Sequence, residues 1–130
     1  MIKGILWIKV SLPEDLKKMA KYEKIPHTHI TLQFNVEKSA FEHLIGKELE
    51  IKIIALCEND EMGLQAFLVE IPEEYKEICI NKFPHISFSN RLDTIPFKVN
   101  EMLESRYFIT RLDNDFVCLK GVVEFFGFFS

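Results

Sequence analysis

The sequence predicts an α+β fold in which antiparallel sheets carry helices packed on their outside. Three observations support this prediction. Apolar segments of strand character recur along the chain, short segments that begin with proline and acidic residues separate them, and one four-residue pattern occurs on two strands. At 130 residues, without a linker or a low-complexity segment, the chain is expected to be a single domain, residues 1–130, with one core or two small lobes.

Elements of the first half are expected to alternate between strand and helix. Residues 4–12 are rich in Ile, Val and Trp, which favour a strand. The Pro-Glu-Asp sequence at 13–15 places a proline and two acids where a helix begins, and a strand follows over about 27–35. Apolar side chains within 40–46 have helical spacing, and the glycine at the end of this segment is expected to close that helix.

The second half is expected to follow the same alternation. Residues 48–58 and 64–71 have strand character on either side of a turn at 59–63, which indicates a β-hairpin. A third helix is expected over about 72–80, and a strand over about 84–88. The remaining predicted elements are a loop at 89–94, a short helix within 96–105, and strands at 107–112 and 116–128 joined by a turn at 113–115.

The repeated pattern is found at His29-Ile30-Thr31-Leu32 and at His85-Ile86-Ser87-Phe88. Side chains on a strand alternate between its two faces, so the imidazole and the hydroxyl of each copy share one face. The apolar side chains point the other way and can anchor the strand in a core. Two such strands facing each other would surround a small anion with two imidazoles and two hydroxyls, which suits chemistry on a phosphate diester.

This paired motif resembles the two-histidine (2H) phosphoesterase superfamily, which includes RNA 2′,3′-cyclic phosphodiesterases. The resemblance implies a bilobal α+β body whose two antiparallel sheets line a central cleft, with one motif from each lobe. It implies that His29 and His85 act as acid and base and that Thr31 and Ser87 bind phosphate oxygens. No metal or other cofactor is needed in such a mechanism.

The implied activity is that of a metal-independent phosphodiesterase acting on a nucleotide 2′,3′-cyclic phosphate or a small cyclic or 2′-5′-linked oligonucleotide. The attacking water must lose a proton while the leaving ribose oxygen gains one, on opposite sides of phosphorus. An imidazole pKa of about 6.5 makes both protonation states accessible near neutral pH, and each group contributes roughly 10²–10⁴-fold. The sequence leaves open which histidine is the base.

Four further residues are candidates for substrate binding. Trp7 and Lys9 share one face of the first strand and could contact a base and a phosphate, although a core tryptophan and a solvated lysine explain them equally well. Lys120 and Glu124 share a face near the C-terminus. The phenylalanine-rich residues 125–129 are expected to form a buried strand first and a base-stacking surface second. Lys17 is expected to be solvated.

Composition indicates the cellular location and the kind of partner to expect. The formal net charge of −4 argues against binding to long duplex nucleic acid and favours a small nucleotide or oligonucleotide. Three widely spaced cysteines, in no C-x-x-C pattern, predict a reducing, cytoplasmic location. The apolar residues 1–10 include two lysines and are too short to span a membrane, so no membrane association is expected. The chain is also expected to be a monomer.

Three alternatives remain open at this point. A binding module could use the same cleft to hold a nucleotide or an RNA end without turnover, and RNA end joining would be the reverse reaction. A zinc site formed by His27, His29 and His85 is a further possibility, because imidazole is a good zinc ligand. No carboxylate or cysteine stands at a recognisable spacing beside these histidines, and His27 is better explained as a residue of the turn or strand start.

Overall fold

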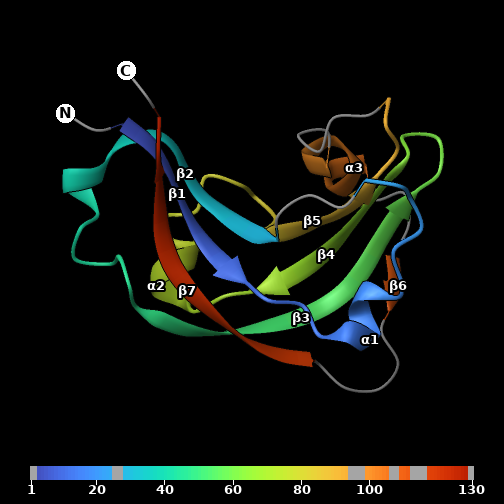
Figure 1. The fold of residues 1–130 in the computed structure, drawn as a ribbon, viewed down its shortest axis with the longest axis horizontal. Helices are drawn as coiled ribbons and strands as arrows, with labels where there is room; N and C mark the ends of the chain where they lie inside the picture. The colour runs from blue at the N-terminus through green and yellow to red at the C-terminus, as the bar shows by residue number, and fades with distance from the viewer. Residues whose placement is uncertain (1–2, 25–27, 94–98, 106–108, 112–116, 129–130) are drawn as a thin grey trace.

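The computed structural model describes residues 3–24, 28–93, 99–105, 109–111 and 117–128. Their order along the chain follows the predicted alternation of strands and helices (Figure 1). The helical segments are α1 (Glu14–Lys17), α2 (Glu73–Lys76), α3 (Val99–Ser105) and the 3-10 helix η1 (Lys38–Ala40). The strands are β1 (Lys3–Val10), β2 (His29–Glu37), β3 (Glu48–Asn59), β4 (Leu64–Glu70), β5 (His85–Asn90), β6 (Ile109–Arg111) and β7 (Val117–Gly127).

The seven described strands form one antiparallel sheet in the order β2-β1-β7-β3-β4-β5, with β6 paired to β3. The end strands β2 and β5 come into contact, so the path is nearly closed. The antiparallel α+β class is confirmed, but the expectation of two sheets is not met. The reason is that residues 48–53 of β3 pair with residues 117–122 of β7, which joins the two halves.

A glycine permits close packing where the halves join. Gly121 lies on β7 between β1 and β3, opposite Val10 and Leu49. A Cβ atom at this position would lie 2.4 Å from Ile8 Cγ2 and 2.5 Å from Ile51 Cδ1, closer than carbon atoms can approach. Glycine therefore lets the side chains of β1 and β3 meet across β7.

The two halves of the sheet contain the same β-α-β unit. In the first unit, β1 leads through Pro13 and α1 to β2; in the second, β4 leads through Pro72 and α2 to β5. Each motif strand also skips one residue in its pairing at the same place, directly after the hydroxyl residue of the motif. The bulged residues are Leu32 and Phe88. The structure thus supports two related halves, down to the position of a β-bulge.

The predicted helices are short or replaced by turns, because the backbone of neighbouring strands forms hydrogen bonds with residues that would have continued them. The helix expected over 72–80 ends at Lys76, and the Ile80 N–H instead donates to the Leu32 carbonyl of β2 at 2.9 Å. The helix expected at 40–46 is replaced by η1 and turns. There the Gly46 N–H donates to the Val123 carbonyl of β7 at 2.8 Å. Helices of one turn are stable here through packing rather than through propensity.

One other predicted boundary differs. Ser89 and Asn90 belong to β5 rather than to a loop, because they continue the pairing with β4 and Asn90 also bonds to Lys24. The turn expected at 113–115 lies outside the described residues. No helix among the residues that the structure describes is long and apolar enough to cross a membrane.

Two apolar clusters lie on opposite faces of the sheet. The larger cluster unites both halves, with Ile30, Phe67 and Phe88 fully buried, and it also takes in Leu16 of α1 and Tyr75 of α2. The smaller cluster lies on the other face of β3 and β4, where α3 covers it. Its buried members are Cys57, Leu64, Ala66, Val99, Met102 and Leu103. The second half is therefore covered on both faces.

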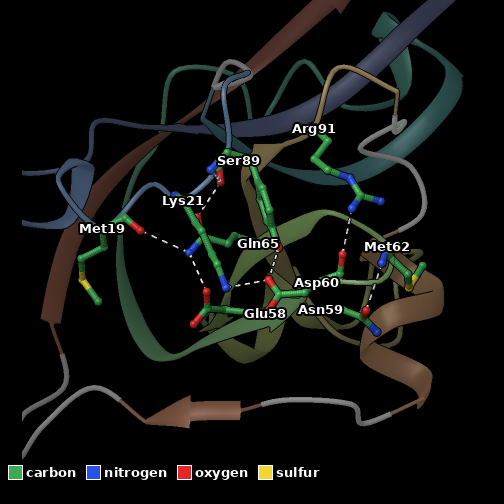
Figure 2. Close-up of polar contacts among 10 residues, drawn as sticks. Met19, Lys21, Glu58, Asn59, Asp60, Met62, Gln65, Ser89 and Arg91 are labelled. Atoms are coloured by element: carbon green, nitrogen blue, oxygen red, sulfur yellow. Dashed lines mark hydrogen bonds and ion pairs between the residues drawn. The ribbon is translucent and has the colours of Figure 1, made fainter.

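A buried amide ties the segment before β2 to β4 and β5 (Figure 2). The Gln65 side chain, 1% exposed, accepts hydrogen bonds from the Lys21 N–H at 2.8 Å and from the Ser89 hydroxyl. Its amide nitrogen donates to the Met19 carbonyl at 3.2 Å and to Glu58 Oε2 at 3.0 Å. Glu58 is the partner of Gln65 in the β3–β4 hairpin, whereas Met19, Lys21 and Ser89 belong to segments remote in sequence. This one side chain therefore holds the loop that leads into the first motif strand.

The Gln65→Met variant is expected to lower the free energy of unfolding by about 1–3 kcal/mol, because it leaves buried donors and acceptors without partners. Urea denaturation followed by far-ultraviolet circular dichroism measures this change. Lys52→Met is the control, since Lys52 is exposed on the neighbouring strand β3. Equal stability of the two variants would contradict the importance of the Gln65 contacts.

Candidate functional site

The two motifs sit on the end strands of the sheet and have the faces that the sequence predicts. On β2, Ile30 and Leu32 are fully buried in the larger core, while His29 and Thr31 are half-buried on the outer face. On β5, Ile86 and Phe88 enter the same core and Ser87 is half-buried. Each histidine is the first residue of its strand, and β2 and β5 start close together and then diverge in Figure 1.

His29 stacks on Trp7, one of the candidate substrate-binding residues. The ring centroids of His29 and Trp7 are 4.2 Å apart with an interplanar angle of 25°. The other neighbour of Trp7 is Phe126, at 5.2 Å and 24°. The indole Nε1–H donates to Glu124 Oε1 at 3.3 Å. Trp7 is therefore fixed between two rings and a carboxylate rather than buried in the core.

A cavity of about 380 Å³ opens beside this stack. Its described lining brings together His29 with the predicted binding residues Trp7, Lys9 and Glu124, and adds Lys17 of α1, whose ammonium group lies 3.5 Å from Glu14 Oε1. The complete described lining is Trp7, Lys9, Val10, Ser11, Leu12, Lys17, Thr28, His29, Glu124 and Phe126. Two lysines and a histidine facing one carboxylate make this hollow suitable for an anionic ligand with an aromatic part.

His85 occupies a more enclosed environment than His29. It is 9% exposed, and its Nδ1 lies 2.8 Å from the carbonyl oxygen of Phe83. A carbonyl can only accept, so Nδ1 carries the hydrogen and the neutral ring presents an unprotonated Nε2. Burial lowers the pKa of His85 below the ordinary histidine value, and the hydrogen bond to Phe83 opposes this only in part. The ring is thus held in one tautomer and favours its neutral form.

The remaining predicted residues lie in different parts of the structure. Thr31 lies between β1 and the segment before β5, where its carbonyl accepts from Cys79 Sγ at 3.5 Å. Lys120 pairs with Glu50 on β3 and lines a different cavity, of about 360 Å³, with Glu48 and Glu50. Four residues along a strand correspond to about 13 Å. Lys120 is therefore separated from Glu124 and from the His29 cavity.

His85 is not among the described residues that line the His29 cavity. The smaller core and α3 cover the neighbouring outer face of the second half, whereas the corresponding face of the first half is open. This difference between the halves was not predictable, because the packing of residues 99–105 against that face depends on long-range contacts. The position opposite the hydroxyl residue of the motif is Trp7 in the first half and Ala66 in the second half.

The sequence did not identify two residues that line the cavity, and it misjudged a third. Lys17 is exposed, as expected, but neither its place at the cavity nor that of Thr28 was predicted. Phe126 was expected first as a buried residue but is 51% exposed. Its position two residues after Glu124 on the same strand was the available signal, because residues at this spacing share a face.

Among the described residues, no three side chains of His, Cys, Asp and Glu gather in a way that could hold a metal ion. His27, considered above as a zinc ligand, lies outside these residues. Comparisons of the chain with protein family models, with curated proteins and with solved structures find no match.

Proposed function

We propose that this chain is a metal-independent phosphodiesterase of the two-histidine type, which hydrolyses a 2′,3′-cyclic phosphate or a small cyclic or 2′-5′-linked oligonucleotide. The observation that carries the proposal is the repeated β-α-β unit. Both units present a histidine and a hydroxyl residue at matching positions, with the same bulge after them, on the two strands that meet where the sheet nearly closes. In the proposed enzyme, the two sides of this junction would take the place of the two lobes.

His85 is suited to the role of general base. A base must be neutral at the working pH and must offer a lone pair to the attacking water. Burial disfavours the charged imidazolium of His85, and the Phe83 carbonyl holds the hydrogen on Nδ1. Nε2 is therefore the atom that would accept the proton.

His29 is suited to the role of general acid. The face of an indole ring attracts a cation, and Trp7 stacks directly on the His29 ring. Glu124, held by the Trp7 N–H, adds a carboxylate to the same cavity. An acid must be protonated before it gives up its proton. In the proposed enzyme Trp7 and Glu124 would favour that form of His29, against the opposing charges of Lys9 and Lys17.

The proposed hydrolysis moves two protons, one on each side of phosphorus. Water attacks phosphorus and loses one proton to His85 Nε2 as the new P–O bond forms. The bond from phosphorus to one ribose oxygen breaks, and that oxygen takes a proton from His29. Thr31 and Ser87 would donate hydrogen bonds to the non-bridging oxygens, where negative charge develops. Lys9 and Lys17 would attract the phosphate into the cavity.

The test is turnover by protein pretreated with EDTA on a panel of 2′,3′-cyclic nucleotides, cyclic dinucleotides and 2′-5′-linked oligonucleotides, followed by chromatography. We expect a ring-opened or cleaved product that EDTA does not suppress. A preparation of the His29→Ala/His85→Ala double variant, purified in the same way, is expected to lack this activity, which excludes a contaminating nuclease. Activity that requires added zinc, or that survives in the double variant, would overturn the proposal. A product of higher mass would indicate end joining.

One observation favours a second candidate function, a nucleotide-binding module without turnover. His85 is only 9% exposed, whereas His29 opens into the cavity with two lysines. In such a module His29 would bind a phosphate and His85 would act only in packing. Tight binding of a nucleotide across the same panel without any product would favour this function over the enzyme.

A further inference from the structure

A row of exposed aromatic rings continues from the His29 stack along the outer face of the sheet. Phe34 is 58% exposed, Phe126 is 51% exposed and Phe128 is 39% exposed. Phe126 stacks on Trp7, and Phe34 meets Phe128 edge to face with 5.7 Å between ring centroids. We call Phe34, Phe126 and Phe128 the aromatic platform. Three large aromatic rings exposed together are unusual on the surface of a soluble monomer.

The strand pairing explains why these rings share one face. Ile5 of β1 pairs with Phe34 of β2 on one side and with Phe126 of β7 on the other. Without the bulge at Leu32, strict alternation would turn Phe34 toward the core, as it turns Ile30. The bulge instead places Phe34 on the side of Ile5, where it reaches Phe128. The same bulge that follows the motif thus also builds the aromatic platform.

We propose that the aromatic platform binds the bases of a short single-stranded oligonucleotide whose terminal phosphate occupies the His29 cavity. This inference rests on the proposed function for the position of the phosphate and deepens it, because it makes an oligonucleotide, rather than a mononucleotide, the preferred substrate. Aromatic rings on an open sheet face stack on unpaired bases with little sequence preference.

Charge and continuity favour this occupant over another protein chain. The platform is continuous, through the Phe126–Trp7–His29 stack, with a cavity that carries Lys9 and Lys17. An oligonucleotide supplies both parts of the match: bases for the rings and a phosphate for the lysines. The chain as a whole is acidic, so the lysines of this cavity supply a local attraction for a phosphate.

Trp7 provides a local reporter, because it is the single tryptophan of the sequence and lies between His29 and the platform. The probes are an adenosine trinucleotide with a 3′-phosphate, adenosine 3′-monophosphate, and an abasic trinucleotide with the same charge as the first. We expect the trinucleotide to quench Trp7 fluorescence and to bind at least about tenfold more tightly than the mononucleotide. The abasic strand is expected to bind no more tightly than the mononucleotide.

Phe34→Ala tests the platform without touching the Trp7 stack. The substitution is expected to reduce the preference for the trinucleotide to less than about threefold and to leave mononucleotide affinity unchanged. Calorimetric titration measures both affinities. Leu92→Ala is the matched control, since Leu92 is a 74% exposed apolar residue outside the platform. It should keep the full preference.

The outcomes separate this inference from the proposed function. If cyclic mononucleotides are hydrolysed but wild type and Phe34→Ala handle the trinucleotide alike, the platform is overturned while the phosphodiesterase stands. If the base-dependent preference appears without any turnover, the platform stands and the phosphodiesterase fails. Self-association of the wild type that Phe34→Ala abolishes, together with no base-dependent binding, would assign the rings to contact between two copies of the chain.

Discussion

Replacing His85 by alanine is expected to lower kcat on a 2′,3′-cyclic nucleotide by roughly 10²–10⁴-fold, the usual contribution of one general base. The ring is held by the Phe83 carbonyl with Nε2 unprotonated, and alanine offers no atom in its place. Steady-state kinetics on the purified variant measure the loss. His43→Ala is the control, because His43 is exposed and lies outside the motifs. A loss no greater than that of His43→Ala would exclude His85 as the base.

The pH profile gives an independent reading of the same residue. Burial lowers the pKa of His85, so the neutral form persists below the ordinary value of 6.5. The acidic limb of kcat/KM should therefore fall below pH 6.5. The contribution of His85 to folding stability has the same sign. It is fully present above pH 6.5 and is lost as the pH falls through the folded pKa, because the unfolded chain accepts the proton more readily than the folded chain. An acidic limb at or above pH 6.5 would contradict the proposed environment.

Replacing Phe67 by alanine is expected to lower the free energy of unfolding by about 3–5 kcal/mol, which is a large part of the stability of a small domain. Phe67 is fully buried on β4, opposite Ile86, and its ring centroid lies 4.6 Å from that of Phe88. The substitution removes a ring from the core directly behind the second motif. Chemical denaturation monitored by circular dichroism measures the change.

Two further variants calibrate this result. Ile80→Ala removes an apolar side chain that is 54% exposed, and it should change stability by no more than about 0.5 kcal/mol. Phe67→Leu keeps most of the volume and should cost less than Phe67→Ala. If Phe67→Ala resembles Ile80→Ala, the packing of the second half differs from that described.

Local patterns were sufficient for most strands and for the faces of the motifs. Alternation placed Ile30 and Ile86 in the core, and put Trp7 on the same face as Lys9. The β3–β4 hairpin was also predictable, since its turn ends at Gly63, whose positive φ of 67° suits glycine. Helix lengths were less predictable. Carbonyl groups of β2 and β7 accept hydrogen bonds from Ile80 and Gly46, which were expected to lie in helices.

The amino-acid sequence by itself determined that two imidazole–hydroxyl pairs would lie on two strands, each anchored by apolar side chains on its opposite face. Side-chain alternation is a property of a single strand and needs no distant partner. Only the tertiary structure decided that one sheet replaces two, that α3 covers the second half, and that the bulge at Leu32 exposes Phe34. These features depend on which strands pair and in what register, and such contacts join residues far apart in the chain.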